Sequence, residues 1–322
     1  MDLFFVISGF CLSYPMLESL RQNRATRFDI ARFFTKRFVR ILPSYYCAIV
    51  LFCAMLVALH LSGNVAPTPP MSQPASAYDF LRQFLFLDQP PNYINGSFWS
   101  LAIEFRWYFA FPLLLLLWIR APRAYFGVAL GSVLAFHLTR LHALDFATLP
   151  ALMLGIVAAD LRARRANIAG AAIAGLLASG AAALWVEPST TEGIIIQNQL
   201  AWQIAAFCFL CVSPSVGWLA RVLSCRPMAF IGLASYSVYL VHEPLIALME
   251  LRGFGPWLAS AAALLAGYAF FLIAERPFVD SPLRTMIDKA TPHVRVFLKW
   301  IGMQPIVEIE PGVVQTRRQA AA

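Results

Sequence analysis

The sequence has few charged residues. Asp, Glu, Lys and Arg together make up 13% of its 322 residues, about half the share of an average soluble domain. Hydrophobic residues make up 60% of the chain, and its mean hydropathy is +0.66. This composition excludes an ordinary soluble domain and is typical of an integral membrane protein.

The sequence also lacks the cysteine pattern of a secreted disulfide framework. Its six cysteines lie mostly inside apolar runs: Cys11, Cys47, Cys53, Cys208, Cys211 and Cys225. Cys208 and Cys211 have redox spacing, but no βαβ pattern surrounds them, which favours simple burial. No phosphate loop, dinucleotide fingerprint, zinc spacing or nucleophile elbow occurs. We therefore expect no bound cofactor and no metal site.

The net charge of +8 does not indicate a nucleic-acid partner, because the basic residues lie between apolar runs. They concentrate in residues 21–40 and after residue 275, whereas the connections on the opposite side hold only Arg82, Arg140 and Arg252. The positive-inside rule then predicts a cytoplasmic C-terminus and an external N-terminus. We expect a multi-pass protein of a bacterial inner (plasma) membrane, in contact with membrane lipid.

Nine apolar runs are long enough to predict an all-α, polytopic membrane helix bundle. They cover residues 3–20, 43–62, 97–118, 125–139, 147–161, 168–186, 194–212, 230–250 and 256–274. A proline-rich external loop, residues 63–95, contains an apolar piece at 80–87. We predict one transmembrane domain over residues 1–280 and a cytoplasmic tail over 281–322. In this tail, residues 294–300 lie on the membrane surface and the end is disordered.

The run 97–118 contains ionisable residues, Glu104 and Arg106, in its first half. Such groups cost at least ~2.5–3.5 kcal/mol each inside a span, so they usually face a bundle interior or a wet cavity. Ser100, Glu104 and Tyr108 recur every four residues and share one helix face. This face is predicted to be the wall of a polar site.

His242 is the second candidate, in the run 230–250. Ser235, Tyr239 and His242 follow helical spacing and could line a shared cavity. The histidine either bonds to a neighbouring helix and so holds the bundle together, or takes part in chemistry directly, and the sequence leaves both open. Pro244 frees the backbone carbonyl of Leu240, which must find another donor.

Arg37 and Arg40 precede the second run as an Arg-x-x-Arg pair. At this spacing two guanidinium groups can clamp the phosphates of an incoming donor. Equally, they can anchor the helix at the membrane face. Both interpretations stay open.

These motifs together resemble the acyltransferase 3 family of membrane acyltransferases. The matching segments occur in family order: residues 2–10, the Arg37-x-x-Arg40 entry with Pro43, residues 98–104, Leu149-Pro150 with Gly155, residues 231–242, and the closing Glu275-Arg276-Pro277-Phe278. The resemblance covers residues 2–280.

The resemblance implies a ten-helix bundle that moves an acyl group, usually acetyl, from a cytoplasmic acyl-coenzyme A to a hydroxyl of a glycan or lipid-linked sugar. It assigns Arg37 and Arg40 to the donor side. It places Glu104 and the face with Ser235, Tyr236, Tyr239 and His242 around the membrane cavity. The acyl-coenzyme A is a substrate, not a resident cofactor.

The sequence departs from the family at its beginning. The family's key histidine lies on a first helix ahead of the Asp-Leu-Phe-Phe motif, with which this sequence starts, and the nine runs are one fewer than ten. We therefore expect a missing first helix and little transferase activity from these 322 residues alone. His242 and Glu104 are then supporting candidates for catalysis.

A transport or scaffold bundle without catalysis is the alternative. In that case Glu104, Arg106 and His242 would guide a polar solute or a proton. The sequence shows no inverted repeat or paired broken helices of the kind transporters use, which favours the acyltransferase.

Overall fold

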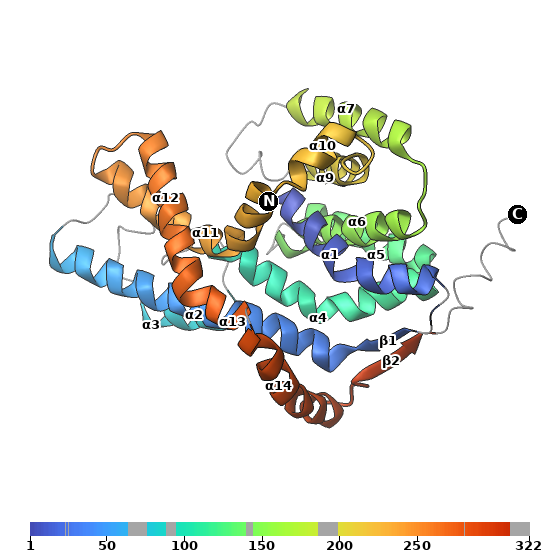
Figure 1. Ribbon diagram of the computed structural model, residues 1–322, viewed down its shortest axis with the longest axis horizontal. Coiled ribbons are helices and arrows are strands. Elements are labelled where there is room, and N and C mark those ends of the chain that lie inside the picture. The colour runs from blue at the N-terminus through green and yellow to red at the C-terminus, as the bar shows by residue number, and fades with distance from the viewer. Residues whose placement is uncertain are drawn as a thin grey trace, which may run out of the picture. The chain divides into compact units, whose positions relative to one another are not determined.

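The computed structural model describes residues 1–22, 24, 26–63, 76–87, 95–139, 144–185, 199–279 and 281–309. Within them the regular structure is helical (Figure 1), apart from a two-stranded sheet of β1 (Thr26–Asp29) and β2 (Ile306–Ile309). The predicted all-α, polytopic bundle is confirmed. The predicted disordered end, from residue 310, lies outside the described residues.

The helices are α1 (Asp2–Arg21), α2 (Ile30–Leu61), α3 (Ala77–Phe84), α4 (Phe98–Arg120), α5 (Pro122–Thr139), α6 (Leu144–Ala163), α7 (Ala169–Trp185), α9 (Gln199–Val212), α10 (Gly217–Leu223), α11 (Arg226–Leu251), α12 (Pro256–Phe270), the π-helix η1 (Phe271–Glu275), α13 (Arg276–Val279) and α14 (Ser281–Trp300). Apart from α2, which begins 13 residues before its predicted run, the helices that correspond to predicted runs differ from them by at most five residues at either end.

Six of these segments are long and apolar enough to cross a membrane: α1, α2, α4, α6, α11, and α12 continued to Phe278. The number rises to seven if α9 and α10, which are bent by 98° relative to each other, form one span. Helices α5 and α7 contain shorter apolar helices. Large apolar side chains on these helices are exposed, such as Leu113 and Leu265, as lipid-facing residues are. The count of nine spans stays a prediction.

The predicted basic loop before the second span is helical over most of its length. Asp29 caps α2 by accepting a hydrogen bond from the backbone N–H of Arg32 at 2.9 Å, so the helix begins at Ile30. Pro43 lies inside the helix instead of opening it. The 32 residues of α2 extend roughly 48 Å, so α2 is longer than one bilayer core.

The chain divides into two compact units. Unit 1 contains Met1–Phe28, Trp107–Ser224 and Val307–Ala322, and unit 2 contains Asp29–Arg106 and Cys225–Ile306. Helix α4 contributes its first half to unit 2 and its second half to unit 1.

In unit 1, α1 runs along α6 and α9 packs against both (Figure 1). Gln203 of α9 joins the three helices by donating to Asp2 Oδ1 at 3.1 Å and to the carbonyl of Ala147 at 2.7 Å. A Cβ added to Gly155 would lie 2.8 Å from the backbone nitrogen of Phe10 and 2.9 Å from Gly9 Cα. The two backbones therefore approach as closely as glycine permits.

In unit 2, α11 and α12 lie side by side and α14 runs along α2 (Figure 1). Arg295 of α14 pairs with Asp29 at the start of α2. An aromatic cluster fills the space between α2, α3 and α4. Phe86 stacks on Tyr45 at 4.3 Å and on Phe105 at 4.0 Å between ring centroids.

Candidate functional site

A buried polar cluster joins the beginning of α4 to the middle of α11 in unit 2. The Tyr239 hydroxyl donates to the carbonyl of Ser97 at 2.7 Å and also bonds the hydroxyl of Ser100. Ser100 Oγ is also 3.2 Å from the Ser97 carbonyl, and each hydroxyl has one hydrogen, so either hydroxyl can be the donor in the second bond. Ser100 has no exposed surface. The predicted polar wall of α4 thus faces Tyr239, a residue predicted to line the same cavity.

Asn95 completes this cluster from the segment before α4. Its side-chain Nδ2 donates to the carbonyl of Leu240 at 2.7 Å, and its Oδ1 accepts from the Ser97 hydroxyl at 2.6 Å. Leu240 carries the carbonyl that Pro244 leaves without its helical N–H donor. The sequence predicts that this carbonyl needs another donor, and Asn95 provides it.

Replacing Asn95 by Ala is expected to lower the free energy of unfolding by about 1–3 kcal/mol, because the buried Leu240 carbonyl loses its donor. Thermal unfolding of the purified protein in detergent measures this. Ser235→Ala is the matched control, since the exposed Ser235 hydroxyl bonds only to Gly232 of its own helix turn, at 2.8 Å. Adding Pro244→Ala restores a backbone N–H and should recover part of the loss. Equal melting of the Asn95 and Ser235 variants would contradict this role.

His242 lies one turn after Tyr239 on α11 and is partly buried. Its Nδ1 is 2.7 Å from the carbonyl of Tyr239. A carbonyl only accepts, so Nδ1 carries the proton and the neutral ring has its lone pair on Nε2. The structural interpretation expected a hydrogen bond to a neighbouring helix, whereas this bond lies within α11. It leaves the other nitrogen able to accept a proton.

Two carboxylates lie near this cluster. Glu104 is one turn after Ser100 on α4 and is only 5% exposed. Glu243 of α11 lies against the backbone of Gly96, where an added Cβ would come within 2.7 Å of the Glu243 Cδ atom. Both carboxylates are close enough to act electrostatically on the Tyr239 hydroxyl. The site therefore combines one imidazole with two acidic groups.

The remaining polar residues of α4 have other surroundings. Tyr108 is buried, and it belongs to unit 1. Arg106 donates to the carbonyl of Phe86 at 2.7 Å, and Phe86 has a left-handed backbone with φ of 57°. Arg106 thus holds the turn after α3, which weakens the transport interpretation that relied on it.

A second polar cluster lies where α2, α11 and η1 meet. The carboxylate of Glu275 is 1% exposed and accepts from the Ser237 hydroxyl at 2.6 Å. Ser44 of α2 donates to the carbonyl of Ala274 at 3.1 Å. Pi-helical turns inside α-helices often occur at functional sites. Arg40 is the basic residue that acts electrostatically on Glu275, so this turn lies beside the Arg-x-x-Arg pair.

The structure places the other predicted site residues as follows. Arg40 is exposed, and Arg37 lies over the ring of Phe33 at 6.0 Å. Tyr236 donates to the carbonyl of Ile41 at 3.0 Å, which ties α11 to α2. Ser235 is exposed. Ser100 and Tyr239 therefore meet directly, whereas Arg40 acts on Glu275 of the second cluster and Tyr236 joins α11 to α2.

Sequence reasoning missed Asn95, Glu243 and Glu275 as members of these clusters. Asn95 lies in a segment interpreted as an external loop, and Glu243 was passed over beside His242. Glu275 appeared only as part of a closing motif. Among the residues that the structure describes, no three His, Cys, Asp or Glu side chains gather as metal ligands would.

The family profile and two of the relatives found by comparison are named for acyl transfer. The sequence profile of an acyltransferase domain, Acyl_transf_3, matches residues 1–276. The peptidoglycan O-acetyltransferase OatA of Listeria monocytogenes is 23% identical over 88% of this chain and 50% of its own length. The O-acetyltransferase OatA of Staphylococcus aureus is 25% identical over 90% of this chain and 53% of its own length.

An uncharacterized protein of Haemophilus influenzae is 31% identical over 36% of this chain. The chain spans about half the length of these relatives. No solved structure matches it.

Proposed function

The chain belongs to the acyltransferase 3 family, and from this premise we propose that it is a membrane O-acyltransferase of glycans or lipid-linked sugars. The acyl group is acetyl and its donor is an acyl-coenzyme A. The names of the OatA relatives, one of which acts on peptidoglycan, support acetyl transfer to a glycan. The single observation that carries the proposed site is the Ser100–Tyr239–His242 cluster between α4 and α11, in which Ser100 is buried and the other two are partly buried.

The reaction forms an ester bond between the acceptor oxygen and the carbonyl carbon of the donor, while the carbon–sulfur bond breaks. The hydroxyl loses its proton, and the sulfur leaves as the thiol. A general base positioned at the hydroxyl contributes about 10²–10⁴-fold. In this chain the lone pair on His242 Nε2 is suited to take that proton.

Glu104 and Glu243 would position the acceptor. Sugar hydroxyls are donors, and a buried carboxylate accepts from them more strongly than a neutral group does. Glu104 is the more buried of the two. It lies on the α4 face that also carries Ser100, so a sugar at this face reaches both Glu104 and the α11 cluster.

Arg37 and Arg40 would bind the donor at the other end of the site. The pyrophosphate of coenzyme A carries the charge that an arginine pair recognises. The buried Glu275 carboxylate acts electrostatically on Arg40. Ser237 and Tyr239, which contact the two clusters, are two residues apart on α11, about 3 Å along the helix axis. The donor and acceptor groups are thus carried by one stretch of α11.

Glu104→Gln is expected to lower acetyl transfer about 10- to 100-fold, the effect of losing a charged hydrogen bond of roughly 1.5–3 kcal/mol. The measurement is transfer of labelled acetyl from acetyl-coenzyme A to envelope glycan, in membranes of cells that express the protein from its own locus. Glu250→Gln, at the exposed end of α11, is the matched control. Transfer by the Glu104 variant at the rate of the control variant would overturn the acceptor role.

A further inference from the structure

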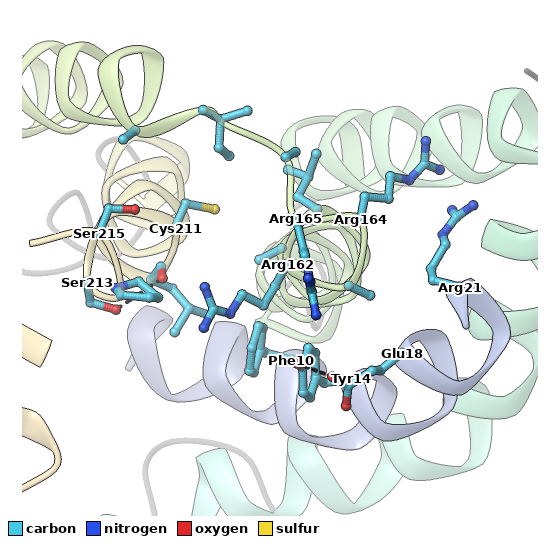
Figure 2. Close-up of a pocket in the computed structure, with 18 of the residues that line it drawn as sticks. Phe10, Tyr14, Glu18, Arg21, Arg162, Arg164, Arg165, Cys211, Ser213 and Ser215 are labelled. Atoms are coloured by element: carbon cyan, nitrogen blue, oxygen red, sulfur yellow. Dashed lines mark hydrogen bonds between the residues drawn. The ribbon is translucent and has the colours of Figure 1, made fainter. Parts of the chain in front are cut away.

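Unit 1 contains a cavity of about 880 Å³ that the proposed reaction does not use (Figure 2). It lies between the C-terminal ends of α1, α6 and α9 and the beginning of α7. Sites for small molecules occupy roughly 300–1,000 Å³. The cavity is therefore large enough for an organic ligand and much larger than an inorganic phosphate requires.

Four arginines line this cavity: Arg21, Arg162, Arg164 and Arg165. Glu18 is the one acidic residue among its lining residues, and it accepts a hydrogen bond from Tyr14 at 2.9 Å. In Figure 2, Arg162 and Arg165 lie nearest to Phe10 and Tyr14, and Arg164 and Arg21 lie farther along the same side of the cavity lining. The cavity is therefore a strongly positive environment.

A buried carboxylate fixes two of these arginines. Asp160 is 1% exposed and pairs with Arg21 at 2.6 Å and with Arg164 at 2.7 Å. Arg162 and Arg165 form no ion pair with a carboxylate in the described part of the chain. Arg165 has a left-handed backbone with φ of 53°, which is uncommon for a residue with a side chain. Arg162 hydrogen-bonds the Tyr14 hydroxyl, and a guanidinium has five N–H donors, so both groups keep donors for an external anion.

The lengths of α1 and α6 indicate how deep in the bilayer the cavity lies. Helices α1 and α6 each have 20 residues, a length of roughly 30 Å that matches the hydrocarbon core of a bilayer. Arg21 and Arg162 are in their last turns. The ends of such spans are at the level of the lipid headgroups, so the cavity opens where lipid phosphates are present.

We propose that this cavity binds the phosphodiester headgroup of an anionic phospholipid, with Arg162 and Arg165 as its principal ligands. Apolar lining residues, among them Phe10, Leu161 and Leu210, lie beside the charged ones and can receive the first carbons of the acyl chains. Basic pockets between spans are known lipid-binding sites. The rings of Phe10 and Tyr14 stack on each other at 5.2 Å, so one face of each is already covered and is not open to a nucleotide base.

This proposal does not depend on acyl transfer, and it is tested by binding. The purified protein in detergent is mixed with phosphatidylglycerol or phosphatidylcholine, and lipid retention is followed by native mass spectrometry. Arg162→Gln/Arg165→Gln is expected to reduce phosphatidylglycerol affinity about thirtyfold, roughly fivefold for each basic residue lost. Arg162→Lys/Arg165→Lys, which keeps both charges, should retain most of it.

Arg120→Gln/Arg123→Gln is the charge-matched control, because both residues are exposed in unit 1 and neither lines the cavity. Its phosphatidylglycerol affinity should stay within about twofold of the unchanged protein, since the lost charges are outside the pocket. Equal losses in the two double variants would overturn the proposal in favour of diffuse surface charge. Displacement of the lipid by adenosine 3′,5′-bisphosphate would also overturn it, because the cavity would then be a nucleotide site.

Discussion

Replacing His242 by Asn is expected to lower acetyl transfer about 100-fold or more, the lower range of what a positioned general base contributes. The Asn amide nitrogen takes the place of Nδ1 and can keep the hydrogen bond to the Tyr239 carbonyl, which is 2.7 Å long in the structure. The variant has no counterpart of Nε2. Transfer from labelled acetyl-coenzyme A and thermal unfolding are measured on the same membrane preparation.

This substitution separates the two roles that the sequence leaves open for His242. If the histidine acts only through its Nδ1 hydrogen bond within α11, Asn keeps both stability and transfer. If Nε2 accepts the proton, Asn keeps stability and loses transfer. His242→Gln is the complementary variant, since its amide reaches the position of Nε2 but removes the Nδ1 bond, and it should lower the melting temperature. Transfer by the Asn variant within about threefold of the unchanged protein would contradict the catalytic role.

Replacing Gly155 by Ala is expected to lower the free energy of unfolding by about 3 kcal/mol or more, because overpacking against a rigid neighbour exceeds the usual range. The new Cβ would lie 2.8 Å from the backbone nitrogen of Phe10 and 2.9 Å from Gly9 Cα. Both contacts are with the backbone of α1, so no side chain can rotate away. The helices α1 and α6 would have to separate.

Gly131→Ala is the matched control within unit 1. Gly127 and Gly131 have the small-xxx-small spacing of a helix-packing surface, but nothing among the described residues lies within 4 Å of a Cβ built at either. Alanine at residue 131 should therefore leave the melting temperature unchanged or raise it slightly. Similar melting of the Gly155 and Gly131 variants would contradict the close packing of α1 on α6.

The sequence predicts those features that depend on local spacing. Apolar runs define the helices. The four-residue repeat puts Ser100, Glu104 and Tyr108 on one face of α4, and all three side chains are buried. The freed carbonyl before Pro244 is likewise a local property. That a donor is needed at Leu240 follows from the sequence; that Asn95 supplies it does not, because the two residues are 145 positions apart.

Other features depend on tertiary contacts, which the spacing of residues along the sequence does not reveal. The basic segment before Pro43 is helical because Asp29 caps it and α14 packs along it. Arg106 faces the turn at Phe86, which a helical wheel of α4 does not indicate. The cavity in unit 1 requires the ends of four helices to meet, although each basic residue in it is visible in the sequence as a membrane-side charge.

The central claim is that the protein is a membrane acyltransferase. It is tested most directly by measuring cleavage of the thioester bond of acetyl-coenzyme A. Membranes from cells with and without the gene at its own locus are supplied with labelled acetyl-coenzyme A, and both free coenzyme A and labelled glycan are measured. We predict that the two products appear together and only when the gene is present. If the protein releases no coenzyme A and labels no glycan, yet carries a polar solute across the membrane, the claim is wrong and the bundle is a transporter.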